Sequence, residues 1–313
     1  MKVLITGARG FIGQYLLARL NADSRFEVES TDREDCDVGD FDGVAAVTAR
    51  TRPDAVCHLA ALCGAAPSRA HPREYYRVNT QGTVNVLDAC RLAGVRSFVL
   101  ASSLTVFGRG DEAKREGSPH APRHPYAASK SAAEGASRIY AKEFGLRCAI
   151  VRPTLVVGAG CKEPHAIGDF VQKAIRGETI ELQGRGDHRR DFVHPRDVAD
   201  AFTACLLGLE RSNPGTCDSF NISEGTPISM KELADFIVSR VGRGGIAFAP
   251  STNQTFSLFA DIERARVGLD FKPRFSIDQI VAEMIRENQE IRPDAFAPHD
   301  DRRYDDQRSV LVA

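Results

Sequence analysis

The chain has 313 residues, which is long enough for a large buried core in one domain or in two lobes. Its hydrophobic content of 42% and charged content of 27% are typical of globular proteins, and its formal net charge of −1 gives no electrostatic reason to expect a nucleic acid or an anionic membrane as a partner. No apolar run approaches the ~20 residues that a membrane-spanning helix needs.

Short apolar strands alternate with helical patterns in the first half of the chain. The expected strands cover residues 2–5, 26–30, 55–59, 97–101 and 147–151. The expected helices between them cover residues 11–20, 41–51, 73–93 and 126–144. This alternation implies right-handed crossovers, and it therefore predicts an α/β fold with a Rossmann-type doubly wound parallel sheet that helices cover on both faces.

Proline and glycine interrupt the second half, where the pattern is less regular. Helices are expected near residues 167–176, 198–209, 230–241 and 277–287. We expect a dinucleotide-binding domain over residues 1–153, with later segments near 192–222 packing back on it. A smaller C-terminal α/β substrate-binding lobe is expected over residues 154–290, followed by a polar, proline-containing tail over residues 291–313.

The stretch "TGARGFIG" lies between the first strand and the first helix, which is the position of a dinucleotide-binding glycine turn. Gly7 permits the tight turn, Gly10 lets backbone N–H groups approach a pyrophosphate, and Gly13 lets the helix pack closely on the sheet. A glycine-rich turn without a ligand is the alternative for this motif taken alone.

Asp32 ends the second expected strand, 19 residues after Gly13. A carboxylate at this position can accept hydrogen bonds from the adenosine ribose hydroxyls of NAD and would repel the 2′-phosphate of NADP. Arg9 and Arg33 could instead pair with that phosphate, so NADP stays open as an alternative to NAD.

Tyr126 and Lys130, in "YAASK", are four residues apart on an expected helix and so lie on one face. A tyrosine with a pKa of about 10 is a poor base at neutral pH, but a neighbouring ammonium group and an oxidised nicotinamide ring both favour the phenolate. Ser103 comes just after a buried strand, at the sheet edge where such folds bind their ligands.

These motifs occur in an order that resembles the extended short-chain dehydrogenase/reductase family, in its nucleotide-sugar epimerase and dehydratase branch. The resemblance rests on "TGARGFIG", Asp32, "CDVGDF", "HLAAL", "VNTQGTVNVLDAC", "ASSLTVFG", "YAASK", "RRDFVHPRDVADA", "FNISEGTPISMKELADFI" and "GLDFKPRFSIDQ", and it covers roughly residues 2–287. UDP-glucose 4-epimerases are the nearest members of that branch in pattern.

The resemblance implies a role for each matching residue. Tyr126 would be the catalytic acid/base, Ser103 would hydrogen-bond the reacting oxygen, and Lys130 would also hold the nicotinamide ribose. The cofactor contacts that it implies are Gly7, Arg9, Gly10, Phe11, Ile12, Gly13, Asp32, Asp37, Val38, Leu59, Ala60, Ala61, Asn79, Ala101, Tyr126, Lys130 and Pro153. Core packing or a local cap explains Asp37, Val38, Leu59, Ala60, Ala61 and Asn79 equally well.

Two positions after Ser103 narrow the chemistry. Related sugar 4,6-dehydratases carry an Asp-Glu pair there, and the GDP-fucose synthase-like branch carries a cysteine at the first position. This chain has Leu104 and Thr105, which disfavour both reactions. The sequence therefore predicts an NAD-dependent nucleotide-sugar 4-epimerase. A dehydrogenase or ketoreductase of a sugar, uronate or other small carbonyl compound is the alternative, and a catalytically inactive cofactor sensor is a third.

The substrate-binding residues expected from the resemblance are Ser103, Tyr126, Leu155 and Arg190. Arg190 matches an arginine that contacts the nucleotide diphosphate. The chain departs from the family at Leu155, where an asparagine is usual, and at Phe256 and Phe259, where a basic residue is often found nearby. These departures leave a different substrate open.

Scattered cysteines without a C-x-x-C pair predict reduced thiols, and the histidines show no metal-ligand spacing, so no metal is expected. His58 is expected to be a core histidine. The N-terminus lacks a secretory pattern, which favours the cytoplasm. The small residues of "AASKSAAEGAS" would let helices approach closely, and the family forms a four-helix bundle between subunits, so a homodimer is expected.

Overall fold

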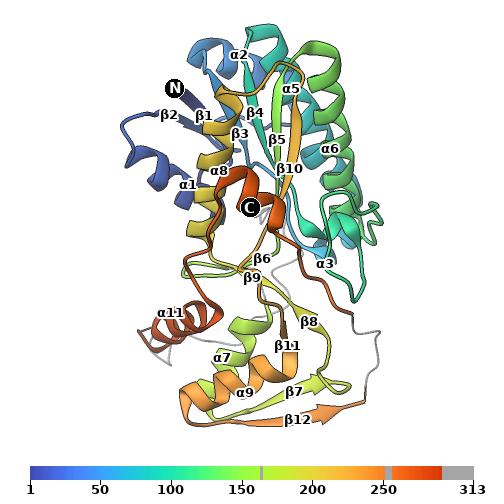
Figure 1. Ribbon diagram of the computed structural model, residues 1–313, viewed down its shortest axis with the longest axis vertical. Coiled ribbons are helices and arrows are strands. Elements are labelled where there is room, and N and C mark those ends of the chain that lie inside the picture. Colours follow the sequence, from blue (N-terminus) through green and yellow to red (C-terminus); the bar gives the residue numbers. More distant parts are fainter. Residues whose placement is uncertain (163–164, 251–255, 291–313) are drawn as a thin grey trace.

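A six-stranded parallel sheet organises the larger part of the protein in the computed structural model, which describes residues 1–162, 165–250 and 256–290 (Figure 1). Its strands are β1 (Lys2–Thr6), β2 (Glu27–Thr31), β3 (Ala55–His58), β4 (Ser97–Ala101), β5 (Arg147–Pro153) and β10 (Cys217–Ile222). They lie in the order β10-β5-β4-β3-β1-β2, with every neighbouring pair parallel. The predicted Rossmann-type sheet is confirmed.

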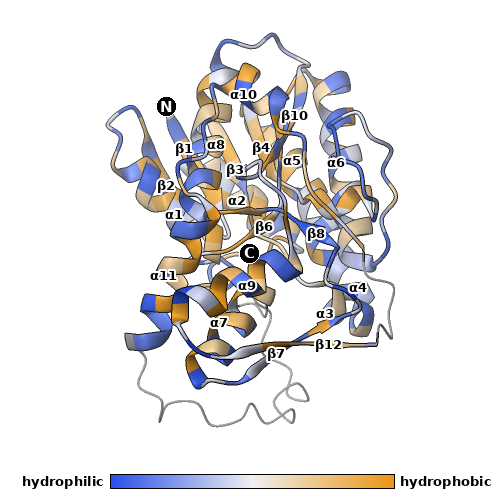
Figure 2. Ribbon diagram, turned by 60° about the horizontal axis from the view of Figure 1, so that its bottom comes forward, coloured by the Kyte–Doolittle hydropathy of each residue, from blue (hydrophilic) through white to orange (hydrophobic). Residues whose placement is uncertain are grey.

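Helices cover both faces of the sheet. On one face lie α1 (Phe11–Asn21) and α8 (Pro195–Glu210), and on the other lie α2 (Phe41–Thr51), α5 (Gly82–Ala93) and α6 (Pro125–Phe144). Successive residues of a strand point to opposite faces, so Val3 and Ile5 enter one hydrophobic core and Leu4 enters the other. Both faces are buried along the inner strands β1, β3, β4 and β5, which explains why these are nearly continuous apolar runs, whereas the edge strand β2 is largely exposed (Figure 2).

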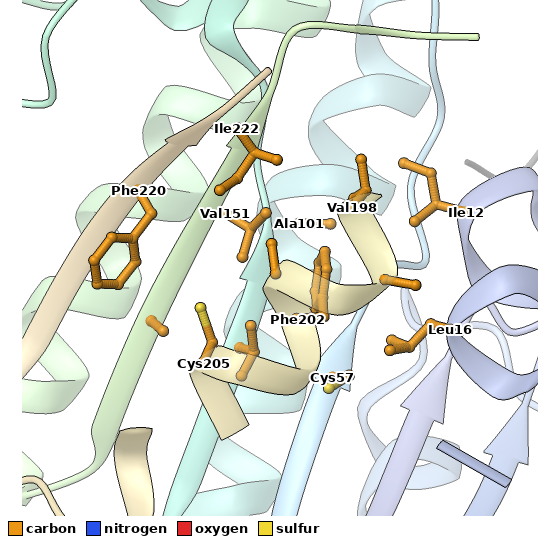
Figure 3. Close-up of a cluster of buried hydrophobic side chains, with 14 of the residues drawn as sticks. Ile12, Leu16, Cys57, Ala101, Val151, Val198, Phe202, Cys205, Phe220 and Ile222 are labelled. Carbon is orange, nitrogen blue, oxygen red and sulfur yellow. The ribbon is translucent and has the colours of Figure 1, made fainter. Parts of the chain in front are cut away.

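Figure 3 shows the core between the sheet and the α1–α8 pair. Phe202 of α8 is fully buried there with Leu16 of α1 and Val151 of β5. Residues late in the sequence thus complete the core that the first strands begin.

The late segments return to the sheet further than the sequence analysis expected. β10 is a strand of the sheet and α8 packs on it, and α10 (Glu263–Leu269) also lies against β10 and α8. Ala265 of α10 and the neighbouring Phe271 are buried in the same core as Phe202. Residues 260–271 therefore pack with the sheet, although the sequence analysis placed them in the smaller lobe, because their apolar side chains cover the face that β10 would otherwise expose.

The predicted helix over residues 73–93 is interrupted. It consists of α4 (Pro72–Tyr75), a π-helical turn over Tyr76–Gln81 and α5. A π-helical turn changes the hydrogen-bonding partner of the backbone without changing the apolar pattern much, so side-chain periodicity does not reveal it. The short helix α3 (Ala65–Ala70) before it was not predicted either.

A second, smaller core lies beyond the carboxyl edge of the sheet (Figure 1). It is built by α7 (Ala166–Arg176), α9 (Met230–Val241) and α11 (Ile277–Glu290) together with the parallel pair β7 (Thr179–Gln183) and β12 (Gly245–Ala249). Two further pairs connect it to the sheet layer: β6 (Leu155–Val156) with β9 (Phe192–Val193), and β8 (Arg189–Arg190) with β11 (Ile228–Ser229). The expected tail over residues 291–313 lies outside the described residues.

Candidate active site

The residues singled out from the sequence gather at the carboxyl edge of the sheet. β1, β3 and β4 are neighbours in register, with Thr6 beside His58 and His58 beside Leu100. The loops that follow these strands contain the glycine turn, Leu59–Ala61 and Ser102–Ser103, and they therefore come together in space. This is the edge at which open parallel sheets bind ligands.

The glycine turn leaves no room for side chains. Gly7 has a φ of +77°, and a Cβ atom there would lie 2.6 Å from the backbone nitrogen of Ala60. A Cβ atom at Gly13 would lie 2.1 Å from the carbonyl oxygen of Gly7. Gly10 is the N-cap of α1 and supplies no side-chain acceptor to the first turn of the helix. The N–H groups in the first turn of α1 and the positive end of the helix dipole make this turn a suitable binding site for the pyrophosphate of a dinucleotide.

Carboxylates surround the position expected for the adenosine ribose. Asp32 is 7% exposed, and its carboxylate accepts the backbone N–H of Arg9 at 2.8 Å. Burial raises the pKa of Asp32, while Arg9 opposes that shift. The Arg9 guanidinium pairs with Glu34 and with Asp35 at 3.3 Å. Arg9 is therefore already neutralised by acids, and the surrounding negative charge favours ribose hydroxyls over a 2′-phosphate.

Lys130 is buried directly behind the end of β4. Its side chain is 4% exposed, and Nζ donates a hydrogen bond to the carbonyl oxygen of Ala101 at 2.8 Å. Burial lowers the pKa of Lys130 to about 8, although the thiol of Cys63 and the carboxylate of Glu134 oppose this shift. The ammonium group is thus held in a fixed place with little water around it.

Tyr126 stands one helical turn before Lys130, at the start of α6. Its ring packs edge-to-face on Tyr75, with centroids 6.3 Å apart, and stacks on His124 at 5.9 Å. Burial raises the pKa of Tyr126, and a hydrogen bond with Ser103 opposes that rise. Ser103 is 8% exposed and accepts hydrogen bonds from the hydroxyl of Thr105 at 2.9 Å and from its N–H at 3.3 Å. The structure thus brings Ser103, Tyr126 and Lys130 together.

The two positions after Ser103 carry no proton-transfer group. Leu104 is 1% exposed and belongs to the core beneath the site. Thr105 is half-buried, and its hydroxyl is used by Ser103. A carboxylate pair such as the one expected of a dehydratase is therefore missing from this position.

Other predicted cofactor residues have structural partners of their own. Asp37 forms an ion pair with Arg77 at 3.0 Å, and the carbonyl oxygen of Val38 accepts a hydrogen bond from Asn85 at 2.9 Å. Leu59, Ala61 and Ala101 are buried, Ala60 is half-buried, and Phe11, Ile12 and Pro153 adjoin the same edge. These contacts give each position a packing role as well as a place beside the expected cofactor.

Asn79 ties the π-helical turn to its surroundings. Its side chain is 1% exposed, accepts the N–H of Leu62 at 2.7 Å and donates to Ser129 of α6 at 3.0 Å. Asn79 therefore links the loop after β3 to the helix that carries Tyr126 and Lys130. Unusual turns of this kind occur often at functional sites.

Two arginines converge on one aromatic ring beside the second lobe. The guanidinium carbons of Arg109 and Arg190 each lie 4.3 Å from the ring centroid of Phe256, and Arg190 also donates to the carbonyl oxygen of Phe256. Burial and the charge of Arg109 lower the pKa of Arg190 to about 10. Neither guanidinium pairs with a carboxylate within the described ranges. Leu155, by contrast, is 42% exposed on β6.

The sequence analysis missed two further features of the site. Cys63 lies beside both Tyr126 and Lys130, where its thiol contributes to the environment of both groups. Glu134 and Arg152 form an ion pair with no exposed side-chain surface. The available signals were a charge four residues after Lys130 on a largely apolar helix face and an arginine inside the apolar run "CAIVRP".

The remaining negative predictions concern metals and His58. No group of side chains suited to a metal ion occurs among the described residues. All eight cysteines lie in the described ranges, and none is in a disulfide.

His58 is 1% exposed, contacts the Thr6 hydroxyl at 2.7 Å, and has its pKa lowered to about 3 by burial and by Lys130. It is a neutral core histidine. No helix in the described part of the chain is long and apolar enough to cross a membrane.

Comparisons with known proteins agree with this geometry. Residues 3–223 match the NAD dependent epimerase/dehydratase family. A UDP-glucose 4-epimerase of Mycolicibacterium smegmatis is 30% identical, over 91% of this chain and 97% of that protein. The UDP-glucose 4-epimerase of Thermus thermophilus in complex with NAD superposes with a TM-score of 0.80 at 26% identity, over 93% of this chain and 100% of that one. MoeE5 in complex with UDP-glucose and NAD gives 0.81 at 29% identity, over 93% and 99%.

Substituting Gly13→Ala should reduce the affinity for NAD at least ~10-fold, because the new methyl group would push the first turn of α1 away from the pyrophosphate seat. Isothermal titration calorimetry measures this change. Gly208→Ala is the matched control, since Gly208 is also helical but has no atom within 4 Å of its added Cβ. Unchanged NAD affinity in the Gly13 variant would mean that the dinucleotide binds elsewhere.

Proposed function

The chain belongs to the NAD dependent epimerase/dehydratase family, and from that membership we propose that it is an NAD-dependent nucleotide-sugar 4-epimerase. The observation that carries the proposal is the convergence of Ser103, Tyr126 and Lys130 at the carboxyl edge of the sheet, with Leu104 and Thr105 in place of ionisable residues. With NAD bound beside it, such a site could take the proton of an alcohol hydroxyl while the alcohol carbon gives up a hydride to the cofactor, but it has no carboxylate pair after Ser103 for the elimination of water.

Tyr126 would perform the proton transfers. With Lys130 charged beside it, the phenolate would accept the proton of the sugar C4 hydroxyl, while the Ser103 hydroxyl donates a hydrogen bond to the same oxygen. The nicotinamide ring of NAD supplies the hydride acceptor and later the hydride donor. The 4-keto sugar then presents its other face, and Tyr126 returns the proton to the oxygen. Protons and hydride balance over the cycle, so no net oxidation occurs.

The residues around the glycine turn support NAD as the cofactor. The turn accommodates a pyrophosphate only because Gly7 and Gly13 lack side chains, and Asp32 has one carboxylate oxygen engaged by the backbone of Arg9. Its other oxygen can accept from a ribose hydroxyl. The acids that bind Arg9 would compete with a 2′-phosphate for that guanidinium.

The two arginines beside Phe256 support a substrate that carries phosphate. Arg109 and Arg190 place like charges on one ring without an acidic partner in the described part of the chain, an arrangement that an anion would stabilise. A nucleoside diphosphate supplies such an anion. Both the Thermus thermophilus and the Mycolicibacterium smegmatis relatives are UDP-glucose 4-epimerases.

A dehydrogenase or ketoreductase acting on a smaller carbonyl compound is the second candidate. Leu155 and Phe256 stand where nucleotide-binding polar groups are usual, and Leu155 is 42% exposed. The same three residues, Ser103, Tyr126 and Lys130, would serve that reaction, but each turnover would convert one oxidised cofactor to its reduced form, or the reverse.

An apolar strip on the outer surface of α5 and α6 supports the expected homodimer. Leu92 of α5 and Ile139 and Phe144 of α6 are each more than half exposed. Gly135, one helical turn before Ile139 on α6, has no atom within 4 Å of its added Cβ. A second copy that packs its own α5 and α6 here would bury these side chains in a four-helix bundle.

The enzyme should interconvert UDP-glucose and UDP-galactose, or a related pair, without net NADH formation, and Tyr126→Phe should lower kcat by ~10²–10⁴-fold while NAD affinity stays within a few-fold. Coupled assays and cofactor absorbance measure both quantities. NADH formation equal to the substrate consumed would favour the dehydrogenase instead. A broad panel of nucleotide sugars with neither turnover nor binding would refute both the epimerase and its substrate class.

Arg190→Ala should raise KM for a nucleotide sugar ~10-fold or more with little change in kcat, since charge-assisted bonds to phosphate contribute about 1.5–3 kcal/mol. Arg109→Ala should act in the same direction. Arg185→Ala is the control, because Arg185 is 90% exposed and contacts only Asp187 in the same turn. Equal KM values in all three variants would show that the diphosphate, if bound, lies elsewhere.

Ile139→Glu should convert a dimer into a monomer, because a charge in the centre of the α5–α6 strip cannot be buried without a partner. Sedimentation equilibrium measures the mass. Val267→Glu, at a 78% exposed position on α10, should leave the mass unchanged. A wild-type protein that sediments as a monomer at high concentration would contradict the proposed dimer.

A further inference from the structure

Three residues one helical turn apart on α6 face the end of β4. Tyr126, Lys130 and Glu134 are spaced by four residues and therefore share one face of the helix. Each lies against one of three consecutive residues: Lys130 donates to the carbonyl oxygen of Ala101, Glu134 accepts the Ser102 hydroxyl, and Tyr126 lies beside Ser103. Helix α6 thus contacts the end of β4 at three successive residues, Ala101, Ser102 and Ser103. The third of these contacts joins the two proposed reacting groups, Ser103 and Tyr126.

Glu134 is the most deeply buried of these three residues. Its side chain has no exposed surface, and Oε1 accepts from Ser102 Oγ at 2.6 Å and from Arg152 Nε at 2.8 Å. Oε2 accepts from Arg152 Nη2 at 2.6 Å. The two parallel bonds from Arg152 form a bidentate pair, which fixes orientation as well as distance.

The partners of Glu134 come from several elements. Arg152 belongs to β5, Ser102 follows β4, and the backbone N–H of Ser102 donates to Val151 of β5 at 2.8 Å. On the outer side, Arg138 of α6 lies 3.2 Å from Oε2, and His120 lies 3.5 Å from it. The carboxylate therefore joins α6 to the ends of both strands that border the catalytic residues.

Stability alone is a weak reason for a charged pair in this place. Removing two charges from water is costly, and apolar replacements of a buried pair often fold as well or better. A directional network does, however, fix the register of the groups that it connects, which a hydrophobic contact does less well. Catalytic groups tolerate displacements of only about 0.5 Å before rates fall.

We propose that Glu134 is a positioning residue, which together with Arg152 and Ser102 holds the end of β4 against α6 and so keeps the Ser103 hydroxyl at the Tyr126 hydroxyl. The inference rests on the proposed function in that Ser103 and Tyr126 are the reacting groups. It assigns no new contact with substrate to Glu134. Its effect passes through the backbone of Ser102 and Ser103.

The decisive variant is Ser102→Ala, because it releases the loop from Glu134 and leaves the Glu134–Arg152 pair and every charge in place. Ser137→Ala is the matched control. Like Ser102, Ser137 is a buried serine, but it lies within α6. Its hydroxyl donates to the carbonyl oxygen of Ala133 in the same helix. Both substitutions remove one buried hydroxyl, and only the first loosens the strand end.

The readout that needs no substrate is the ionisation of Tyr126 in the NAD-loaded enzyme, measured as phenolate absorbance relative to Tyr126→Phe. The groups that face Tyr126 are Ser103, Cys63, Tyr75, Lys130 and His124. Of these, only the Ser103 bond is disturbed by Ser102→Ala. Because that bond favours the phenolate, its weakening should raise the apparent pKa of Tyr126 by ~0.5–1 unit in Ser102→Ala and leave it unchanged in Ser137→Ala.

The second readout is turnover. Ser102→Ala should lower kcat ~3–10-fold with KM and NAD affinity unchanged, and Glu134→Gln should lower it further. Equal Tyr126 pKa values and equal kcat in Ser102→Ala and Ser137→Ala would overturn the proposal, whether or not Glu134→Gln folds. If the wild-type enzyme epimerises nothing, the proposed function fails, while the Tyr126 titration still decides the positioning role.

Discussion

The parallel direction of the six strands is the constraint on which the site depends. Because all of them end at one edge, loops that are far apart in the sequence meet there: the glycine turn after β1, the segment after β3 and the serines after β4. The crossover helices are then obliged to start at the same edge, which brings the N-terminus of α1 to the glycine turn and the first turns of α6 to Ser103.

Without a cofactor, the protein disfavours the charged forms of both Tyr126 and Lys130. Burial raises the pKa of Tyr126 and lowers that of Lys130, so each group is driven towards its neutral form. A positively charged nicotinamide ring beside them would reverse this balance for the phenolate. The phenolate would therefore form only where a hydride acceptor is already in place, which limits proton abstraction to the complete site.

Local patterns in the sequence predicted much of this architecture. The first five strands and the glycine turn follow from apolar runs and glycine spacing. The Ser103–Tyr126–Lys130 group rested on a helical spacing together with the resemblance to the extended short-chain dehydrogenase/reductase family. The parallel pair β7–β12 was missed although "TIELQ" alternates, because its partner strand lies more than sixty residues later. Glu134 was missed for another reason. On a helix pattern a glutamate resembles a solvated charge, and only the packing of α6 against Arg152 of β5 shows that it is buried.

The path of the chain between the two cores has a consequence for how such a protein can change. After β5 the chain enters the second lobe, returns as α8 and β10, leaves again, and returns once more as α10 before α11 joins the second core. The smaller lobe is therefore a set of insertions threaded through the sheet layer rather than a module joined by one linker. It could not be exchanged as a unit without cutting the core around the sheet.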